Sequence, residues 1–200
     1  MSKLHFLNVD PGDCTIIEHN SGHVSIVDVC DGFTPEDIQR GLASYSNVEA
    51  DWKKVLVKGA NGNFRMKENL TNPVEYLSNL GLKNVFRFIL THPDMDHMDG
   101  LKALSDYASI SNFWDSGVRK DKPDFGGSPY HEEDWDQYIK LVNGEDGVKS
   151  AIRLAGDRFQ SANKNSDNES GGDGLYILAP DKELVKVYVV RTYWTEGLIN

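Results

Sequence analysis

Two adjoining runs decide the fold of this chain: Val85–Leu90 (VFRFIL) and, directly after it, Thr91–His97 (THPDMDH). Apart from one arginine, the first run is apolar, which is typical of a strand buried within a sheet. From Met98 to Tyr107, apolar side chains recur at helical spacing. We therefore expect a central strand, a polar loop and a helix, in that order.

The polar loop carries the two commonest non-thiolate ligand types for divalent metals, imidazole nitrogens and carboxylate oxygens. Its four candidate metal ligands are His92, Asp94, Asp96 and His97. A polar turn in which one aspartate caps the following helix is the alternative, but capping does not explain two histidines bracketing two aspartates. Asp99 is expected in the first turn of that helix, as a modest partner of the helix dipole.

The rest of the chain predicts further strands and helices in a mixed order. Pro73 to Leu80 is expected to be a helix, because an asparagine precedes it and Gly81 follows it. Residues 162–174 are polar and of low complexity, which predicts a flexible loop. The other expected strands are 4–9, 14–18, 24–29, 110–114 and 175–178, and the other expected helices begin at Thr34-Pro35 and span 132–142. The sequence thus indicates one α/β (α+β) domain over residues 1–200, opening with an antiparallel meander.

Composition narrows the class of protein. The chain has 200 residues, of which 39% are hydrophobic, and a net charge of −10, so its surface would repel a phosphate backbone rather than coat it. Cys14 and Cys30 are expected to be buried free thiols. The N-terminus shows no apolar leader, and no apolar run approaches the roughly 20 residues of a membrane span. We expect a cytoplasmic protein that makes no membrane contact.

The loop and its surroundings resemble one superfamily. The run THPDMDHMDG (91–100) is similar to the HxHxDH loop of the metallo-β-lactamase superfamily, in the form HPDxDHxGG found in its ComEC-type competence-protein branch. The opening FLNVDPGDC (6–14) resembles that branch's FLDVGQGDA, and IVD (26–28) matches the aspartate of its third strand. Three shorter matches follow in the expected order: FWDSG (113–117), AGD (155–157) and LAP (178–180).

The resemblance implies an αββα sandwich and a two-metal site. His92 and Asp94 would serve one ion and Asp96 and His97 the other, with Asp96 also beside the attacking water as the catalytic residue. Asp28 and Asp13 would support the site from its edge, although Asp28 is also a common residue type at a strand-end turn. Because Asp94 replaces the family's second histidine, harder ions such as Mn²⁺ or Mg²⁺ should compete with Zn²⁺.

The expected chemistry is metal-assisted hydrolysis of a phosphodiester, in a nucleotide or a nucleic acid, by an activated water. Two other hypotheses are compatible with the sequence. One is a non-catalytic or regulatory module that keeps the fold, and the other is a hydrolase of a small ester, thioester or lactone.

The chain also departs from the family pattern. The further ligands of the family's second half are not found after Leu178, and His131 matches none of them. We therefore expect a sandwich that is incomplete at its C-terminus, with an uncovered apolar sheet surface. Residues beyond Asn200, a partner chain or a second copy would have to complete the metal site.

Overall fold

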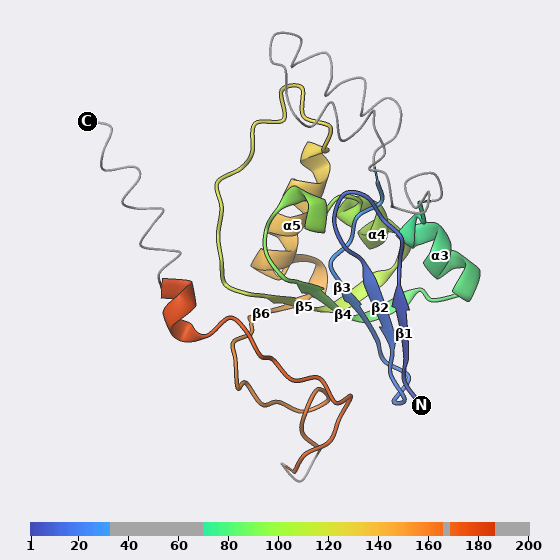
Figure 1. Ribbon diagram of the computed structural model, residues 1–200, viewed down its shortest axis with the longest axis vertical. Coiled ribbons are helices and arrows are strands. Elements are labelled where there is room, and N and C mark those ends of the chain that lie inside the picture. Colours follow the sequence, from blue (N-terminus) through green and yellow to red (C-terminus); the bar gives the residue numbers. More distant parts are fainter. Residues whose placement is uncertain (33–69, 166–168, 187–200) are drawn as a thin grey trace, which may run out of the picture.

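The computed structural model describes residues 1–32, 70–165 and 169–186. These ranges hold a single six-stranded sheet in the order β1-β2-β3-β4-β5-β6 (Figure 1). The strands are β1 (Lys3–Phe6), β2 (Thr15–Glu18), β3 (Val24–Val27), β4 (Asn84–Leu90), β5 (Ser109–Asp115) and β6 (Lys149–Ile152). The first three strands pair antiparallel and the last three join in parallel. The expected mixed α/β class and the opening meander are confirmed.

The helices agree with the sequence prediction where strong capping residues mark their ends. α3 (Pro73–Leu80) begins after Asn72, whose side chain accepts hydrogen bonds from the backbone N–H groups of Val74 and Glu75. It ends at Gly81, which has a φ of 71° and closes the last turn. Further helical segments are η2 (Met95–His97), α4 (Leu101–Tyr107), α5 (Glu132–Asn143) and η3 (Glu145–Gly147), and residues 182–186 are also helical.

α3, α4 and α5 lie on one side of the sheet and bury the main core there, whereas the helical residues 182–186 lie apart from them (Figure 1). Phe88 of β4 and Phe113 of β5 stack with ring centroids 6.1 Å apart, and Tyr138 of α5 meets Phe113 edge-on at 6.3 Å. Ile16 and Ile26 pair across β2 and β3 and are fully buried, or nearly so. Because successive side chains of a strand point to opposite faces of the sheet, these buried residues determine which face of each strand meets the helices.

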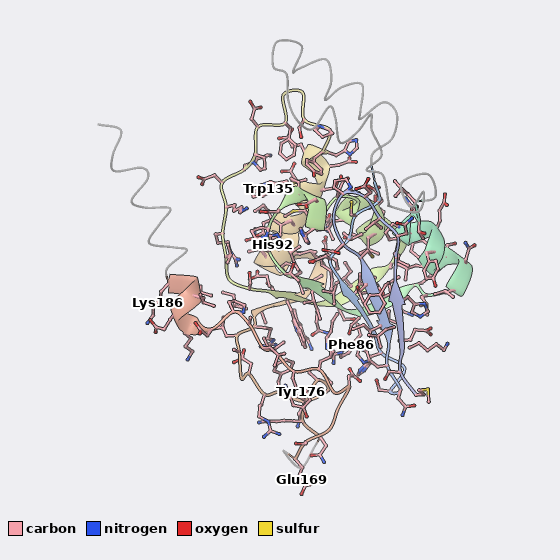
Figure 2. The ribbon with its side chains drawn as sticks, viewed as in Figure 1. Phe86, His92, Trp135, Glu169, Tyr176 and Lys186 are labelled. Carbon is pink, nitrogen blue, oxygen red and sulfur yellow. The ribbon has the colours of Figure 1, made fainter. Side chains whose placement is uncertain are left out.

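The other side of the sheet is covered by residues 153–165 and 169–180, which are largely irregular. Figure 2 shows Phe86 and Tyr176 on this side, away from the helices and Trp135. Arg87 of β4 is fully buried here, with its Nη1 2.5 Å from Asp173 and its Nη2 donating to the carbonyl of Ser161 at 2.6 Å. The predicted loop is irregular chain in the described parts of 162–174, and this ion pair joins it to the sheet at Asp173.

Two further sequence predictions differ from the structure. Residues 175–178 form no strand, and β6 (Lys149–Ile152) was not foreseen, because three of its four side chains are exposed and give no apolar alternation. The expected uncovered apolar surface is found at the edges of the described sheet rather than at its centre: Leu4 is 58% and Phe6 77% exposed on β1, and Ile152 is 49% exposed on β6. The helix expected from Thr34 lies outside the described residues.

None of the helices in the described part of the chain combines the length and the apolarity that a membrane crossing requires.

Candidate metal centre

The loop from His92 to His97 leaves the carboxyl end of β4, which lies between β3 and β5 in the sheet. The chain after β3 runs beside it: the N–H of Asp28 donates to the carbonyl of Ile89 at 2.9 Å, and the N–H of Val29 donates to the carbonyl of His97 at 3.0 Å. The expected order of strand, loop and helix is confirmed. The polar side chains are thus held on a rigid base at an edge of the sheet where sites commonly form.

The first turn of the chain also lies against this loop. Gly12 has a φ of 95°, and a Cβ at this position would overlap the backbone carbonyl of Asp96. Only glycine allows both this conformation and this close approach. Asp13, the next residue, is exposed and makes no hydrogen bond to the loop among the described residues. No direct contact among the described residues therefore supports the expected role of Asp13, whereas Gly12 approaches the backbone of Asp96 closely.

Asp28 is the residue that organises the loop. It is 3% exposed and adopts a positive φ of 55°, a conformation that aspartate tolerates better than most residues. Its carboxylate accepts hydrogen bonds from the backbone N–H of Thr91 at 2.8 Å and from the Thr91 hydroxyl at 2.6 Å. It also lies 2.9 Å from Nδ1 of His97. Asp28 is therefore brought to the site, as the resemblance implied.

These contacts set the tautomers of both histidines. Nδ1 of His97 faces the Asp28 carboxylate, which only accepts, so this nitrogen carries the proton. The one proton of the Thr91 hydroxyl is donated to Asp28, so its oxygen accepts at 3.0 Å from Nδ1 of His92. In the neutral form of each ring, the contacts at Nδ1 leave Nε2 facing the loop carboxylates, and neutral imidazole is the form that binds metals.

The four candidate ligands lie in two neighbouring pairs. Nε2 of His92 is 3.5 Å from Oδ2 of Asp94, and Nε2 of His97 is 3.7 Å from Oδ2 of Asp96. The two imidazole rings are 4.0 Å apart between centroids and tilted by 51°. Each Nε2 thus has a carboxylate oxygen beside it, and the two pairs are neighbours because the two imidazole rings are in contact.

Lys120 reaches the loop from the segment after β5 and forms an ion pair with Asp94. The lysine side chain is 44% and the aspartate side chain 37% exposed, so solvent screens this pair. Lys120 was not singled out in the sequence, because 26 residues separate it from Asp94. In the structure the Lys120 ammonium occupies the Asp94 carboxylate, so a metal ion binding to Asp94 would have to compete with it.

A different group in the described ranges brings three donor atoms within 4.8 Å of one another: Asp99, His131 and Asp134. The expectation that Asp99 lies in the first turn of the helix is wrong. The N-cap of α4 is Gly100, and Asp99 precedes it with 1% exposure and with Nδ1 of His131 4.0 Å from its carboxylate. His131, which matched no family ligand, is therefore part of a group that could hold a cation.

Asp134 has a structural role within that group. Its Oδ1 accepts the backbone N–H of Lys102 at 2.8 Å, in the first turn of α4. Burial raises the pKa of the Asp134 carboxyl, against the effect of the hydrogen bonds from the backbone of Lys102 and Gly100. This cap could not be predicted from the sequence, because Asp134 lies on α5 and its acceptor serves α4, a helix distant in the chain.

The buried thiols are not activated nucleophiles. Both cysteines are free and buried, as expected. Burial, together with the charges of Asp28 and Asp13, raises the pKa of the Cys14 thiol to about 12. Burial likewise raises the pKa of Cys30. Nucleophilic attack requires the thiolate, so neither residue supplies one near neutral pH.

No protein-family model matches the chain, and a search of curated proteins finds no significant relative.

Proposed function

We propose that this protein is a metal-dependent hydrolase of phosphodiester bonds that uses the loop from His92 to His97. The observation that carries the proposal is the arrangement of Asp28 and Thr91, which engage Nδ1 of both histidines and leave each Nε2 next to a carboxylate. A carboxylate or hydroxyl on the far nitrogen is the usual support for a metal-binding histidine. The donor set of two imidazoles and two carboxylates fits Zn²⁺ or Mn²⁺, with Mg²⁺ as a harder third option.

Each residue of the loop would have a distinct part. His92 and Asp94 would hold one ion, and Asp96 and His97 the second. A bound pair of such ions supplies a water of lowered pKa and stabilises charge on the leaving oxygen. The Asp96 carboxylate, 36% exposed, is open to accept the proton of that water. Asp28 keeps the proton of His97 on Nδ1 throughout.

The proposal extends to the fold. A mixed sheet with helices on one face would form one half of an αββα sandwich, and a partner chain or a second copy would supply the remaining ligands. The size of the protein, measured with and without Zn²⁺ or Mn²⁺, tests this part.

The deciding experiment combines metal titration with hydrolysis of bis(p-nitrophenyl) phosphate by the full chain. Activity should depend on Zn²⁺ or Mn²⁺ and be lost in Asp96→Asn. Asp106→Asn is the matched control, because Asp106 is on the exposed side of α4 and pairs only with Lys102 among the described residues. Metal-independent hydrolysis, or equal activity in both variants, contradicts the proposal.

A second candidate, a non-catalytic module of the same fold, is favoured by one observation. The donor atoms that converge within 4.8 Å belong to Asp99, His131 and Asp134 rather than to the loop. In that case metal would bind without hydrolysis, and His131→Ala would weaken binding more than His92→Ala. The same titration therefore separates the two candidates.

A further inference from the structure

A cavity of about 650 Å³ opens beside the metal loop. Thr91, His92 and Asp94, at the carboxyl end of β4, line part of it. The rest of the lining comes mainly from the end of β5 and from residues between 177 and 185. This volume lies within the range of roughly 300–1,000 Å³ that small-molecule pockets occupy.

Most of the wall is apolar. Trp114 lines the cavity from β5, and Ile177 and Pro180 face it from the segment that covers the sheet. Trp114 is 3% exposed, because Phe159 meets it edge-on at 4.7 Å and 90° and the Arg87 guanidinium lies 5.1 Å from its ring centroid. The indole is thus a fixed part of an apolar wall that suits an apolar part of a ligand.

Two cations interrupt this apolar wall: Arg153 and Lys120. The Arg153 guanidinium lies 4.2 Å from the ring centroid of Phe159 and 5.2 Å from that of Trp114, which fixes its position. Its Nε is buried and has no hydrogen-bond partner within the described ranges, and the acidic group whose charge reaches it is Asp157.

Arg119 nearby shows the contrast. Its guanidinium is bound on two sides by the carboxylate of Asp115, at 3.2 and 3.1 Å. Arg153 makes no such ion pair with the part of the chain that the structure describes. It therefore keeps donors for an anionic group in the cavity, and a guanidinium on aromatic rings is a common way to present such donors.

We propose that this cavity binds a small organic phosphodiester with an aromatic group, the ring in the apolar part lined by Trp114, Ile177 and Pro180 and the phosphate toward Arg153 and Lys120. The volume admits one such molecule rather than a duplex. The carboxylates of Asp94 and Asp96 and the net charge of −10 disfavour a polyanion. Binding in the cavity does not require hydrolysis. Only the expectation that the ester bond lies next to His92 and Asp94 rests on the proposed function.

Binding is tested on the full chain in EDTA, with three probes. Methyl phenyl phosphate has both the ring and the charge, dimethyl phosphate the charge alone, and benzyl alcohol the ring alone. The first should bind at least tenfold tighter than either of the others. In NMR titrations it should shift the indole N–H signal of Trp114 and leave that of Trp135, which lies in the helix core, in place.

Two variants identify the anion-binding groups. Arg153→Met should weaken methyl phenyl phosphate binding at least tenfold, while Arg158→Met, which alters an exposed neighbour, should not. If Arg153→Met fails to fold, Lys120→Met replaces it, with an expected loss of several fold. Its matched control is Lys122→Met, since Lys122 is 43% exposed and pairs with Glu132 and Asp136 instead.

The outcomes separate this inference from the proposed function. Tight probe binding without metal-dependent hydrolysis would support the cavity and refute the enzyme. Equal binding by Arg153→Met or Lys120→Met and the unaltered protein, or benzyl alcohol binding as tightly as methyl phenyl phosphate, would overturn the inference even if bis(p-nitrophenyl) phosphate is hydrolysed.

Discussion

Oδ2 of Asp28 lies 2.9 Å from Nδ1 of His97, and the same carboxylate binds the backbone and the hydroxyl of Thr91. Asp28→Asn should therefore lower metal affinity roughly 10- to 100-fold, as loss of such support usually does. Asparagine tolerates a positive φ and still offers one acceptor to the Thr91 N–H, so the fold should persist. Calorimetric titration with Zn²⁺ or Mn²⁺ measures the change, and an unaltered affinity would show that Asp28 merely closes the strand.

Asp96 and Asp106 provide a comparison of two aspartates in neighbouring segments. Asp96→Ala should reduce hydrolysis roughly 100-fold or more, the scale of losing a general base. Asp106→Ala should leave hydrolysis unchanged, because this residue is exposed on α4. Asp99 would be a poor control, since it is 1% exposed and its replacement would disturb the packing. The assignment fails if the turnover rates of the two alanine variants agree at equal folding.

Asp134 should matter for stability through its cap on α4. Asp134→Ala removes the acceptor for the Lys102 N–H and should cost about 1–2 kcal/mol of unfolding free energy. Asp134→Asn keeps an acceptor and removes a buried charge, so it should cost less. Urea denaturation in EDTA measures both variants, and an equal loss in the two would contradict the capping role.

The pH dependence of Asp134 follows from the direction of its pKa. Because burial raises this pKa in the folded protein, the favourable contribution is present below the unfolded value of about 3.9. It is lost as pH rises through the folded pKa. Relative to Asp134→Asn, the unaltered protein should therefore gain stability as pH falls from 7 to 4. A constant difference over this window would contradict the prediction.

The ion pair of Arg87 and Asp173 joins the irregular chain around Asp173 to the sheet. Burial alone would raise the pKa of Asp173, but hydrogen bonds from Ser21, His23 and Arg87 outweigh it and lower that pKa. The stabilisation is therefore full above the unfolded pKa of about 3.9 and is lost as pH falls through the lower folded value.

Asp173→Asn leaves the buried Arg87 without its counter-charge and should cost about 3–5 kcal/mol at neutral pH. The difference from the unaltered protein should shrink below about pH 4, as its own carboxylate becomes protonated. Urea unfolding at pH 7, 5 and 3 measures it. A difference that is independent of pH would show that the carboxylate charge is not what holds the segment.

The sequence was informative wherever a signal is local. Asn72 and Gly81 mark both ends of α3, and the run from His92 to His97 is contiguous, so its position after a buried strand could be predicted. Contacts between residues that are distant in the sequence could not be predicted. Arg153 reaches Trp114 from a later segment, Asp134 caps a helix that begins 33 residues before it, and β6 has too little burial to leave a pattern.

The pair of Lys120 and Asp94 gives a final prediction about metal affinity. The ammonium and a metal ion both require the Asp94 carboxylate, so they compete for it. A half-exposed ion pair contributes about 0.2–1 kcal/mol, which corresponds to a factor of roughly 1.4 to 5 in affinity. Lys120→Met should therefore bind Mn²⁺ tighter by that factor, while Lys122→Met should not. Salt screens exposed ion pairs, so the difference in Mn²⁺ affinity between Lys120→Met and the unaltered protein should narrow as ionic strength rises. A range of about 0.05 to 0.5 M suits this test, because it shortens the Debye length from above ~10 Å to below it. Weaker Mn²⁺ binding by Lys120→Met would mean that Lys120 holds Asp94 in place for the metal instead of competing with it.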